Sequence, residues 1–478
     1  MDARYKSLRV GLIGLGLEAY WSQFEGLEER LEGYLSEVEG KISDPARTIA
    51  NLGLVDSPAK AIEAGHACRR SDIDLLLVHI TTYALSSTVL PVILMAKVPV
   101  ILLNIQPTEA IDYGRFNRMS NRTAMTGEWL AYCSSCPVPE IANVMRRLDM
   151  PFHQVTGVLH DDPQCWLELE GWLKAAAVAK GLSHSTLGLM GNYYSGMLDI
   201  ATDLAQVSGR FGINIEQLEV EELCAIRREV AEGDIAAKMQ SFASFFAISD
   251  DCTEEELIRA ARTAVALDTL VAQHDLDLMA YYHKGTGIAE TEDVMSSVIL
   301  GTSMLTGHGV PVAGEYEVKN AIAMKIMDLF GAGGSFTEYY AVDFASDLVL
   351  MGHDGPGHVN IAEDKIQVRP LQVYHGKVGN GLSVEMSVKH GPVTLLSIVE
   401  NKRRGFALLV AHGESVPGEI LEIGNTNSRY SFPLGARGFI EAWNSHGPAH
   451  HCAIGVEHIG PRLEMLARLL DLDFFQVC

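Results

Sequence analysis

The sequence contains few cysteines for its length. Eight cysteines occur in 478 residues, too few for a disulfide-stapled scaffold. Cys133 and Cys136 form a closely spaced pair (CSSC), but a zinc ribbon would need a second such pair. A redox or metal role for the pair stays open. Two structural thiols are the interpretation that we favour, because the context of a thioredoxin-like motif is missing. Reduced thiols indicate a cytoplasmic protein.

Long hydrophobic runs and an excess of positive charge are also missing. The longest apolar stretch, residues 89–105, is interrupted by Pro91, Lys97 and Pro99, so no membrane span is predicted. The first residues, MDARYKSLRV, lead straight into a predicted strand, and we expect no signal peptide. The formal net charge of −24 argues against a nucleic-acid partner, since a polyphosphate needs a basic surface. A hydrophobic content of 47% with 21% charged residues is typical of a soluble globular protein.

The chain is too long for one ordinary core, and its first part alternates strand-like and helix-like segments. Apolar strands are predicted at residues 8–17, 48–55, 74–80 and 98–105. Helices such as residues 23–40 and 59–68 separate them. Continuous apolar strands between helices are typical of a parallel, doubly wound sheet. We therefore predict an α/β fold with an N-terminal α/β domain over residues 1–178.

The strand and helix pattern then restarts. Strands are predicted at residues 185–190, 214–220 and 276–282, and helices at residues 198–211, 224–238 and 253–274. The restart predicts a second doubly wound parallel-sheet domain over residues 179–330. From about residue 331 the segments alternate apolar and polar residues between glycine-containing turns. These segments are residues 366–370, 382–388, 393–399 and 406–411. This pattern predicts a C-terminal antiparallel β-barrel domain over residues 331–478, ending in a helix and a short strand.

A glycine turn offers an alternative function. Residues 14–19 (GLGLEA) follow the first predicted strand and fit the G-x-G-x-x-A dinucleotide fingerprint, so an NAD(P)-dependent oxidoreductase is an alternative. The acidic ribose ligand should follow about twenty residues later. Here Asp56 comes about forty residues later, and the turn runs into the bulky Tyr20 and Trp21. A tight strand-to-helix turn without a cofactor is therefore favoured.

Two glutamates and a group of histidines in the last third carry the chemistry. Glu315 lies where an apolar run meets a helical one, and Glu338 follows a glycine-rich turn. His353 ends an apolar strand, and His450 and His451 precede another. Adjacent strand residues point to opposite faces, so only one of the paired histidines is expected to face a given metal. Two Glu and two His suit Mn²⁺, Mg²⁺, Co²⁺ or Zn²⁺, and glutamates also move protons.

Four segments together carry a resemblance: residues 314–321, 335–340, 347–353 and 449–451. In these segments the chain resembles the L-arabinose isomerases, which form a wider group with the L-fucose isomerases. The resemblance is strong over about residues 310–355 and 435–478. It implies two α/β domains, a C-terminal β-barrel and a ketol isomerase that favours Mn²⁺. It also implies a homo-oligomer, a hexamer with active sites at subunit boundaries.

The resemblance also implies roles for individual residues. Glu315, Glu338, His353 and His451 match the metal ligands, and the two glutamates match the acid/base pair. His450 matches a histidine that lies against the substrate. These roles fit aldose–ketose conversion through an ene-diol, with a small-molecule sugar as the substrate.

The sugar-reading segments depart from the family pattern. The loop after the first strand differs, and Met125 stands where the family has a substrate-contacting histidine. L-Arabinose, another pentose, a hexose and a deoxy sugar therefore stay open as substrates. The candidate pocket residues are Tyr20, Trp21, Met125, Tyr193 and Tyr282.

Two further histidines and one further function stay open. His358 and His79 are possible additional site residues, and for His358 a turn role is favoured because glycine and proline surround it. Paired α/β domains also build non-catalytic sugar-binding proteins, but the extra β domain argues against that function.

Overall fold

The structure is a computed structural model that describes residues 7–285, 287–372, 380–401 and 405–478. Contacts divide the chain into two units, residues 1–180 and 181–478, and each is described by itself. The first predicted domain boundary, at residue 178, lies beside this division. The further division at residue 330 stays a prediction. The first six residues, which were expected to lead into a strand, lie outside the described residues.

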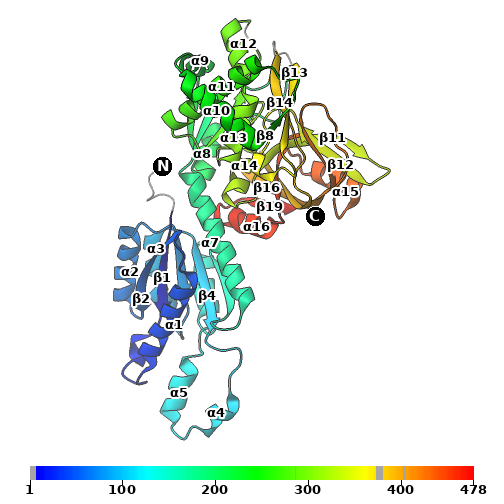
Figure 1. Cartoon of the computed structure of the whole chain (residues 1–478). Coiled ribbons are helices and arrows are strands. Elements are labelled where there is room, and N and C mark those ends of the chain that lie inside the picture. Colours follow the sequence, from blue (N-terminus) through cyan, green and yellow to red (C-terminus); the bar gives the residue numbers. More distant parts are fainter. Residues whose placement is uncertain (1–6, 286, 373–379, 402–404) are drawn as a thin grey trace. The chain divides into compact units, whose positions relative to one another are not determined.

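The first unit is built on a parallel sheet with the strand order β2-β1-β3-β4-β5 (Figure 1). The strands are β1 (Leu8–Leu15), β2 (Arg47–Val55), β3 (Leu75–His79), β4 (Val100–Gln106) and β5 (His153–Val158). The helices are α1 (Leu27–Ile42), α2 (Pro58–Arg70), α3 (Ser86–Ala96), α4 (Tyr113–Arg118), α5 (Arg122–Leu130), α6 (Val138–Arg147) and α7 (Pro163–Ser183). One apolar cluster joins the sheet to α2, α3 and α6, and another joins it to α1. Burial on both faces explains the continuous apolar strands and confirms the doubly wound prediction.

The glycine turn after β1 packs against its own neighbouring side chains. The chain continues as a short 3₁₀ helix over Glu18–Tyr20, and α1 begins only at Leu27. A Cβ atom at Gly16 would lie 2.7 Å from the Trp21 ring, whose Nε1 donates to Asp56 at 2.8 Å. A pyrophosphate site uses the N-terminus of a helix that directly follows the turn. That helix is missing from this turn, so the structure does not favour the dinucleotide alternative.

The CSSC pair differs from the prediction of two structural thiols. Cys133 and Cys136 form a disulfide, with their Cα atoms 5.7 Å apart. Helix α5 ends at Leu130 and α6 begins at Val138, so the short connection between the helices brings the two sulfurs together.

The second unit begins with a parallel sheet in the order β10-β9-β6-β7. Its strands are β6 (Thr186–Gly191), β7 (Asn214–Leu218), β9 (Leu278–Tyr282) and β10 (Val312–Ala313). The helices are α8 (Leu204–Phe211), α9 (Val220–Arg228), α10 (Glu232–Phe245), α11 (Glu254–Gln273), α12 (Ala289–Met295), α13 (Ile299–Gly307) and α14 (Val318–Leu329). The predicted helix 198–211 starts only at Leu204, where the Asp203 side chain caps it. Residues 192–203 therefore form a loop at the carboxyl end of β6.

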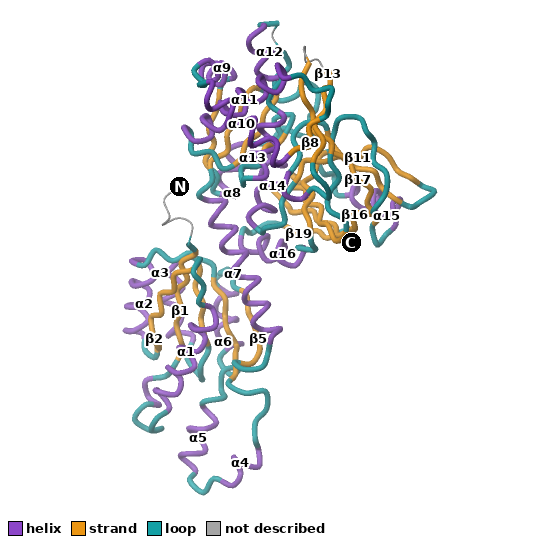
Figure 2. The backbone as a smooth tube through the Cα atoms, in the orientation of Figure 1, coloured by secondary structure: helices purple, strands orange, loops and turns teal. Residues whose placement is uncertain are grey.

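A closed antiparallel barrel follows, as predicted (Figure 2). Its strands, in order around the barrel, are β15 (Gly391–Asn401), β18 (His451–Val456), β11 (Ser335–Asp343), β12 (Leu348–His353), β17 (Thr426–Ser431) and β16 (Gly405–Val416). Pairing of β15 with β16 closes it, and β19 (Asp473–Gln476) adds to β16 in parallel. Helix α15 (Gly435–Ser445) buries Trp443 and Phe439 in its core, and α16 (Gly460–Leu469) precedes β19.

Two predicted barrel strands belong elsewhere. β13 (Ile366–Gln372) and β14 (Asn380–Glu385) form a hairpin that pairs in parallel with β8 (Phe246–Ile248). Alternation predicts a half-buried strand but cannot identify its partner, and β8 lies more than a hundred residues earlier in the chain. Among the described residues, the helices are too short or too polar to cross a membrane.

Candidate metal and acid/base site

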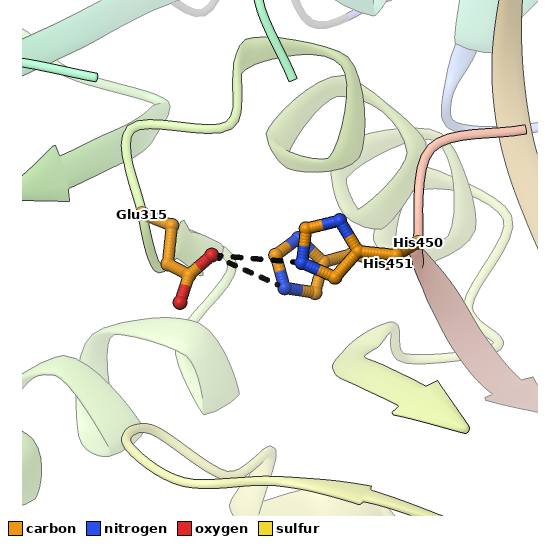
Figure 3. A group of neighbouring side chains, drawn as sticks. All are labelled: Glu315, His450 and His451. Atoms are coloured by element: carbon orange, nitrogen blue, oxygen red, sulfur yellow. Dashed lines mark ion pairs between the residues drawn. The ribbon is translucent and has the colours of Figure 1, made fainter. Parts of the chain in front are cut away.

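Glu315 lies on a strained turn between β10 and α14. Glu315 and Tyr316 adopt left-handed backbone conformations, with φ values of 57° and 64°. Such values are uncommon outside glycine and collect at functional sites. The turn is held by hydrogen bonds of Tyr316, whose backbone N–H donates to the Tyr281 carbonyl at 3.0 Å and whose hydroxyl donates to Gln217 at 3.0 Å. Figure 3 shows the Glu315 carboxylate facing the imidazole rings of His450 and His451.

Strand register in the barrel brings the other donors together. Glu338 in β11 is paired with His451 of β18 on one side and with Gly352 of β12 on the other. Directly opposite residues place their side chains on one face with Cβ atoms about 5 Å apart. His353 ends β12, and its ring lies 5.0 Å from that of His451. Phe336 contacts both rings, at centroid distances of 4.5 and 4.4 Å, and so limits their rotation.

The donors form two overlapping groups that share His451. One group is Glu338, His353 and His451, and the other is Glu315, His450 and His451, with the donor atoms in each group within 4.8 Å of one another. Glu315 Oε2 lies 3.4 Å from His451 Nε2 and 3.8 Å from His450 Nε2. Glu315 Oε2 and His451 Nε2 are buried without a hydrogen-bond partner among the described residues. A buried carboxylate oxygen and a buried imidazole nitrogen that lack hydrogen-bond partners are suitable ligand atoms for a divalent cation.

Both paired histidines reach Glu315, which differs from the expectation that only one would face the site. The reason is local: β18 begins at His451, so His450 precedes the strand and does not alternate with its neighbour. The rings of the two histidines lie 3.8 Å apart.

Hydrogen bonds hold the Nδ1 atoms of His451 and His353, the ring nitrogens that are not available to the site. Glu317 accepts a short hydrogen bond from His451 Nδ1, and both side chains are at most 1% exposed. His353 Nδ1 donates to the Asp354 carbonyl at 2.5 Å. Both contacts leave Nε2 as the acceptor nitrogen, the arrangement that orients histidine ligands of metals. The sequence motif contained Glu317 but did not indicate this role; its position two residues after Glu315 was the available signal.

Asp199 holds His450 in the same manner. Its Oδ2 accepts the backbone N–H of His450 at 3.0 Å and the ring Nδ1–H at 2.6 Å. Burial opposes the charge of Asp199, but the hydrogen bonds from His450 outweigh burial and lower the Asp199 pKa to about 2. Nothing in the sequence indicated Asp199, because it lies in an irregular loop 251 residues before His450.

Burial shifts the pKa values of Glu315, His353 and His451. It raises the pKa of Glu315 to about 7, and the charge of Glu338 adds to this rise while His450 opposes it. Burial also lowers the pKa of His353 to about 4 and that of His451 to about 3. The two buried histidines are therefore neutral at pH 7, the form that binds a metal. A glutamate with a pKa near 7 is suited to move protons in both directions.

A cavity of about 930 Å³ opens onto the site. Glu315, Glu338 and His353 line it, together with the predicted pocket residue Tyr282. Tyr193, also predicted, packs instead against Tyr316, with ring centroids 4.9 Å apart. Its neighbour Tyr194, which was not among the predicted pocket residues, lines the cavity and packs against Tyr282. The centroids of these two rings lie 4.7 Å apart. Within the described part of the chain, the residues that line the cavity do not include His450, whose Nε2 lies 3.8 Å from the lining residue Glu315.

The remaining sequence candidates lie outside the donor groups formed by the described residues. Tyr20 and Trp21 pack in an apolar cluster of the first unit, and Met125 is half-buried on α5. His79 Nε2 lies 3.3 Å from the Ile105 carbonyl at the buried end of β3. His358 accepts the backbone N–H of Asn360 at 3.3 Å, a capping contact that agrees with the turn role that we favoured for it.

The chain is similar to known proteins both in its last third and over longer alignments. Residues 333–473 match the family described as "L-arabinose isomerase C-terminal domain". An L-arabinose isomerase of a Nocardioides species is 23% identical over 70% of this chain, and that of Shewanella baltica is 26% identical over 64%. The alignments span 69% and 63% of those relatives' own lengths, and 62% for the L-arabinose isomerase of Halalkalibacterium halodurans, which is 22% identical over 64% of this chain. A solute-binding protein from Burkholderia multivorans aligns over 68% of this chain and 94% of its own length, with 13% identity and a TM-score of only 0.17.

Proposed function

We propose that the chain is a divergent member of the L-arabinose isomerase family and that it is a metal-dependent aldose–ketose isomerase. Its substrate is a pentose or a related sugar, such as L-arabinose. The observation that carries the proposal is the group of Glu338, His353 and His451, whose shared His451 also lies 3.4 Å from Glu315. Glu315 Oε2 and His451 Nε2 are buried without a hydrogen-bond partner among the described residues.

The four residues would hold the ion through two carboxylates and two imidazoles. This donor set suits Mn²⁺, with Mg²⁺, Co²⁺ and Zn²⁺ as alternatives. When bound, the ion would hold two neighbouring oxygens of the open-chain sugar and stabilise the negative charge that develops on them. Glu317 fixes the ring of His451, and Phe336 supports the rings of His353 and His451.

Glu315 and Glu338 would move the protons. Isomerisation requires removal of a proton from the carbon beside the carbonyl, which gives an ene-diol, and its return to the neighbouring carbon. One glutamate accepts and returns the carbon proton while the other exchanges a proton with the sugar oxygen. The near-neutral pKa of Glu315 matches such a reversible transfer.

The sugar would be read by His450 and by residues of the cavity wall. Tyr282 lines the cavity, and Tyr193 supports the Glu315 turn through Tyr316. Tyr20, Trp21 and Met125 stay predicted sugar contacts. The family resemblance extends the proposal to a homo-oligomer, a hexamer with sites at subunit boundaries. A cytoplasmic location stays a prediction from the low cysteine content.

A panel of aldoses and ketoses tests the function. The full chain is first stripped with EDTA and then supplied with Mn²⁺, and conversion is followed by chromatography of the sugars. We expect interconversion of at least one aldose–ketose pair that requires Mn²⁺ and no dinucleotide. Conversion that persists in EDTA, or conversion of no sugar at all, would contradict the proposal. Oxidation of a sugar that depends on NAD(P) would instead support the dinucleotide alternative.

A further inference from the structure

The geometry points to Asp199 as a positioning residue that aims His450 at the catalytic glutamate Glu315. This inference rests on the proposed isomerase function and deepens it, because it names what fixes the histidine that the proposed function assigns to the sugar. Among the described residues, Asp199 neither lines the cavity nor belongs to a donor group, so it would act through its contact with His450.

Asp199 is anchored although its side chain is 39% exposed. It lies in the loop of residues 192–203, after β6. The following residue, Ile200, is fully buried, and Lys319 of α14 donates from its ammonium group to the Asp199 carbonyl at 2.7 Å. Lys319 is itself only 5% exposed. Helix α14 starts directly after the Glu315 turn, so the same helix supports both ends of the Asp199–His450–Glu315 connection.

The contact between Asp199 and His450 sets both the position and the orientation of the ring. One carboxylate oxygen accepts the backbone N–H and the ring Nδ1–H of His450. With Nδ1 bound to Asp199, the ring is oriented so that Nε2 faces Glu315 Oε2, at 3.8 Å. The His450 side chain is 36% exposed and precedes the first residue of β18, so the strand does not hold it. Asp199 therefore supplies the constraint that neighbouring His451 receives from Glu317.

Loss of this constraint should impair substrate positioning and leave metal binding unchanged. His451, His353 and Glu338 keep their own contacts when Asp199 is removed. A misplaced positioning group costs an enzyme up to about a hundredfold in rate. We expect D199A to lower kcat/KM about tenfold to a hundredfold, to weaken binding of an unreactive pentitol to the Mn²⁺-loaded protein, and to leave Mn²⁺ affinity unchanged.

The experiment compares D199A, H450A and the double variant in the full Mn²⁺-loaded chain. Isothermal titration with the pentitol that corresponds to the converted sugar is the readout besides activity. D203A is the matched control, because Asp203 lies in the same loop but caps α8 and does not contact His450. The double variant should have the same kcat/KM and pentitol affinity as H450A, since Asp199 acts only through His450. D203A should keep wild-type kcat/KM and pentitol affinity.

Three outcomes would overturn the inference. These are a D199A variant within twofold of the wild type in kcat/KM and pentitol affinity, a double variant whose losses multiply, and a D203A loss equal to that of D199A. A wild-type chain that isomerises no sugar would instead overturn the proposed function. The two failures are therefore distinguishable.

Discussion

Replacement of Glu315 by glutamine is expected to lower kcat by about 10²–10⁴-fold or more while the protein stays folded. Glutamine keeps the size of the side chain and one oxygen, but it cannot accept and release a proton. Glu315 is the donor in which burial raises the pKa to about 7, so its ability to exchange protons near neutral pH is what the substitution removes. Glu338, which faces His451 across the barrel strands, is expected to give a loss of the same order.

Steady-state conversion of the sugar identified by the panel provides the measurement, with thermal unfolding as the check on folding. Glu441→Gln is a matched control, since Glu441 is an exposed glutamate on α15. A folded E315Q or E338Q variant with near-normal turnover would remove that glutamate from the acid/base pair.

Replacement of His451 by alanine is expected to abolish useful metal binding. His451 belongs to both donor groups, is almost fully buried, and has Glu317 dedicated to its outer nitrogen. Removal of a supporting partner of a metal ligand typically costs about 10–100-fold in affinity. Loss of the shared ligand itself should cost more than about 100-fold.

Titration of Mn²⁺ into the metal-free H451A protein, followed by calorimetry or by the electron paramagnetic resonance of free Mn²⁺, measures this loss. His390→Ala is the control, because His390 is a partly exposed histidine of the same unit that pairs with Glu363 at 3.1 Å. H451A that binds Mn²⁺ as the wild type does would place the ion elsewhere.

The fold and the donor residues could largely be predicted from the sequence, because both depend on local patterns. Apolar runs buried on both sheet faces identify parallel strands, and the donors occupy turns and strand ends that carry a family resemblance. The register between β11 and β18 brings Glu338 and His451 together. A strand pattern in the sequence does not specify which residues of two strands lie opposite each other.

The positioning residues could not be predicted, since they act through contacts between distant segments. Asp199 reaches His450 from an irregular loop. Glu317 lies within one of the segments that carry the family resemblance, but the segment does not indicate its contact with His451. The pairing of β13 with β8 was missed for the same reason. The disulfide between Cys133 and Cys136 depends on where α5 ends and α6 begins, and helix boundaries are poorly specified by propensity.

The most direct test of the central claim is a joint titration of Mn²⁺ binding and isomerase activity in the EDTA-stripped wild-type chain. We expect one Mn²⁺ per chain with activity proportional to the bound ion, and loss of both in H451A. Full activity in the metal-free protein, or tight Mn²⁺ binding that is unchanged in H451A, would contradict it.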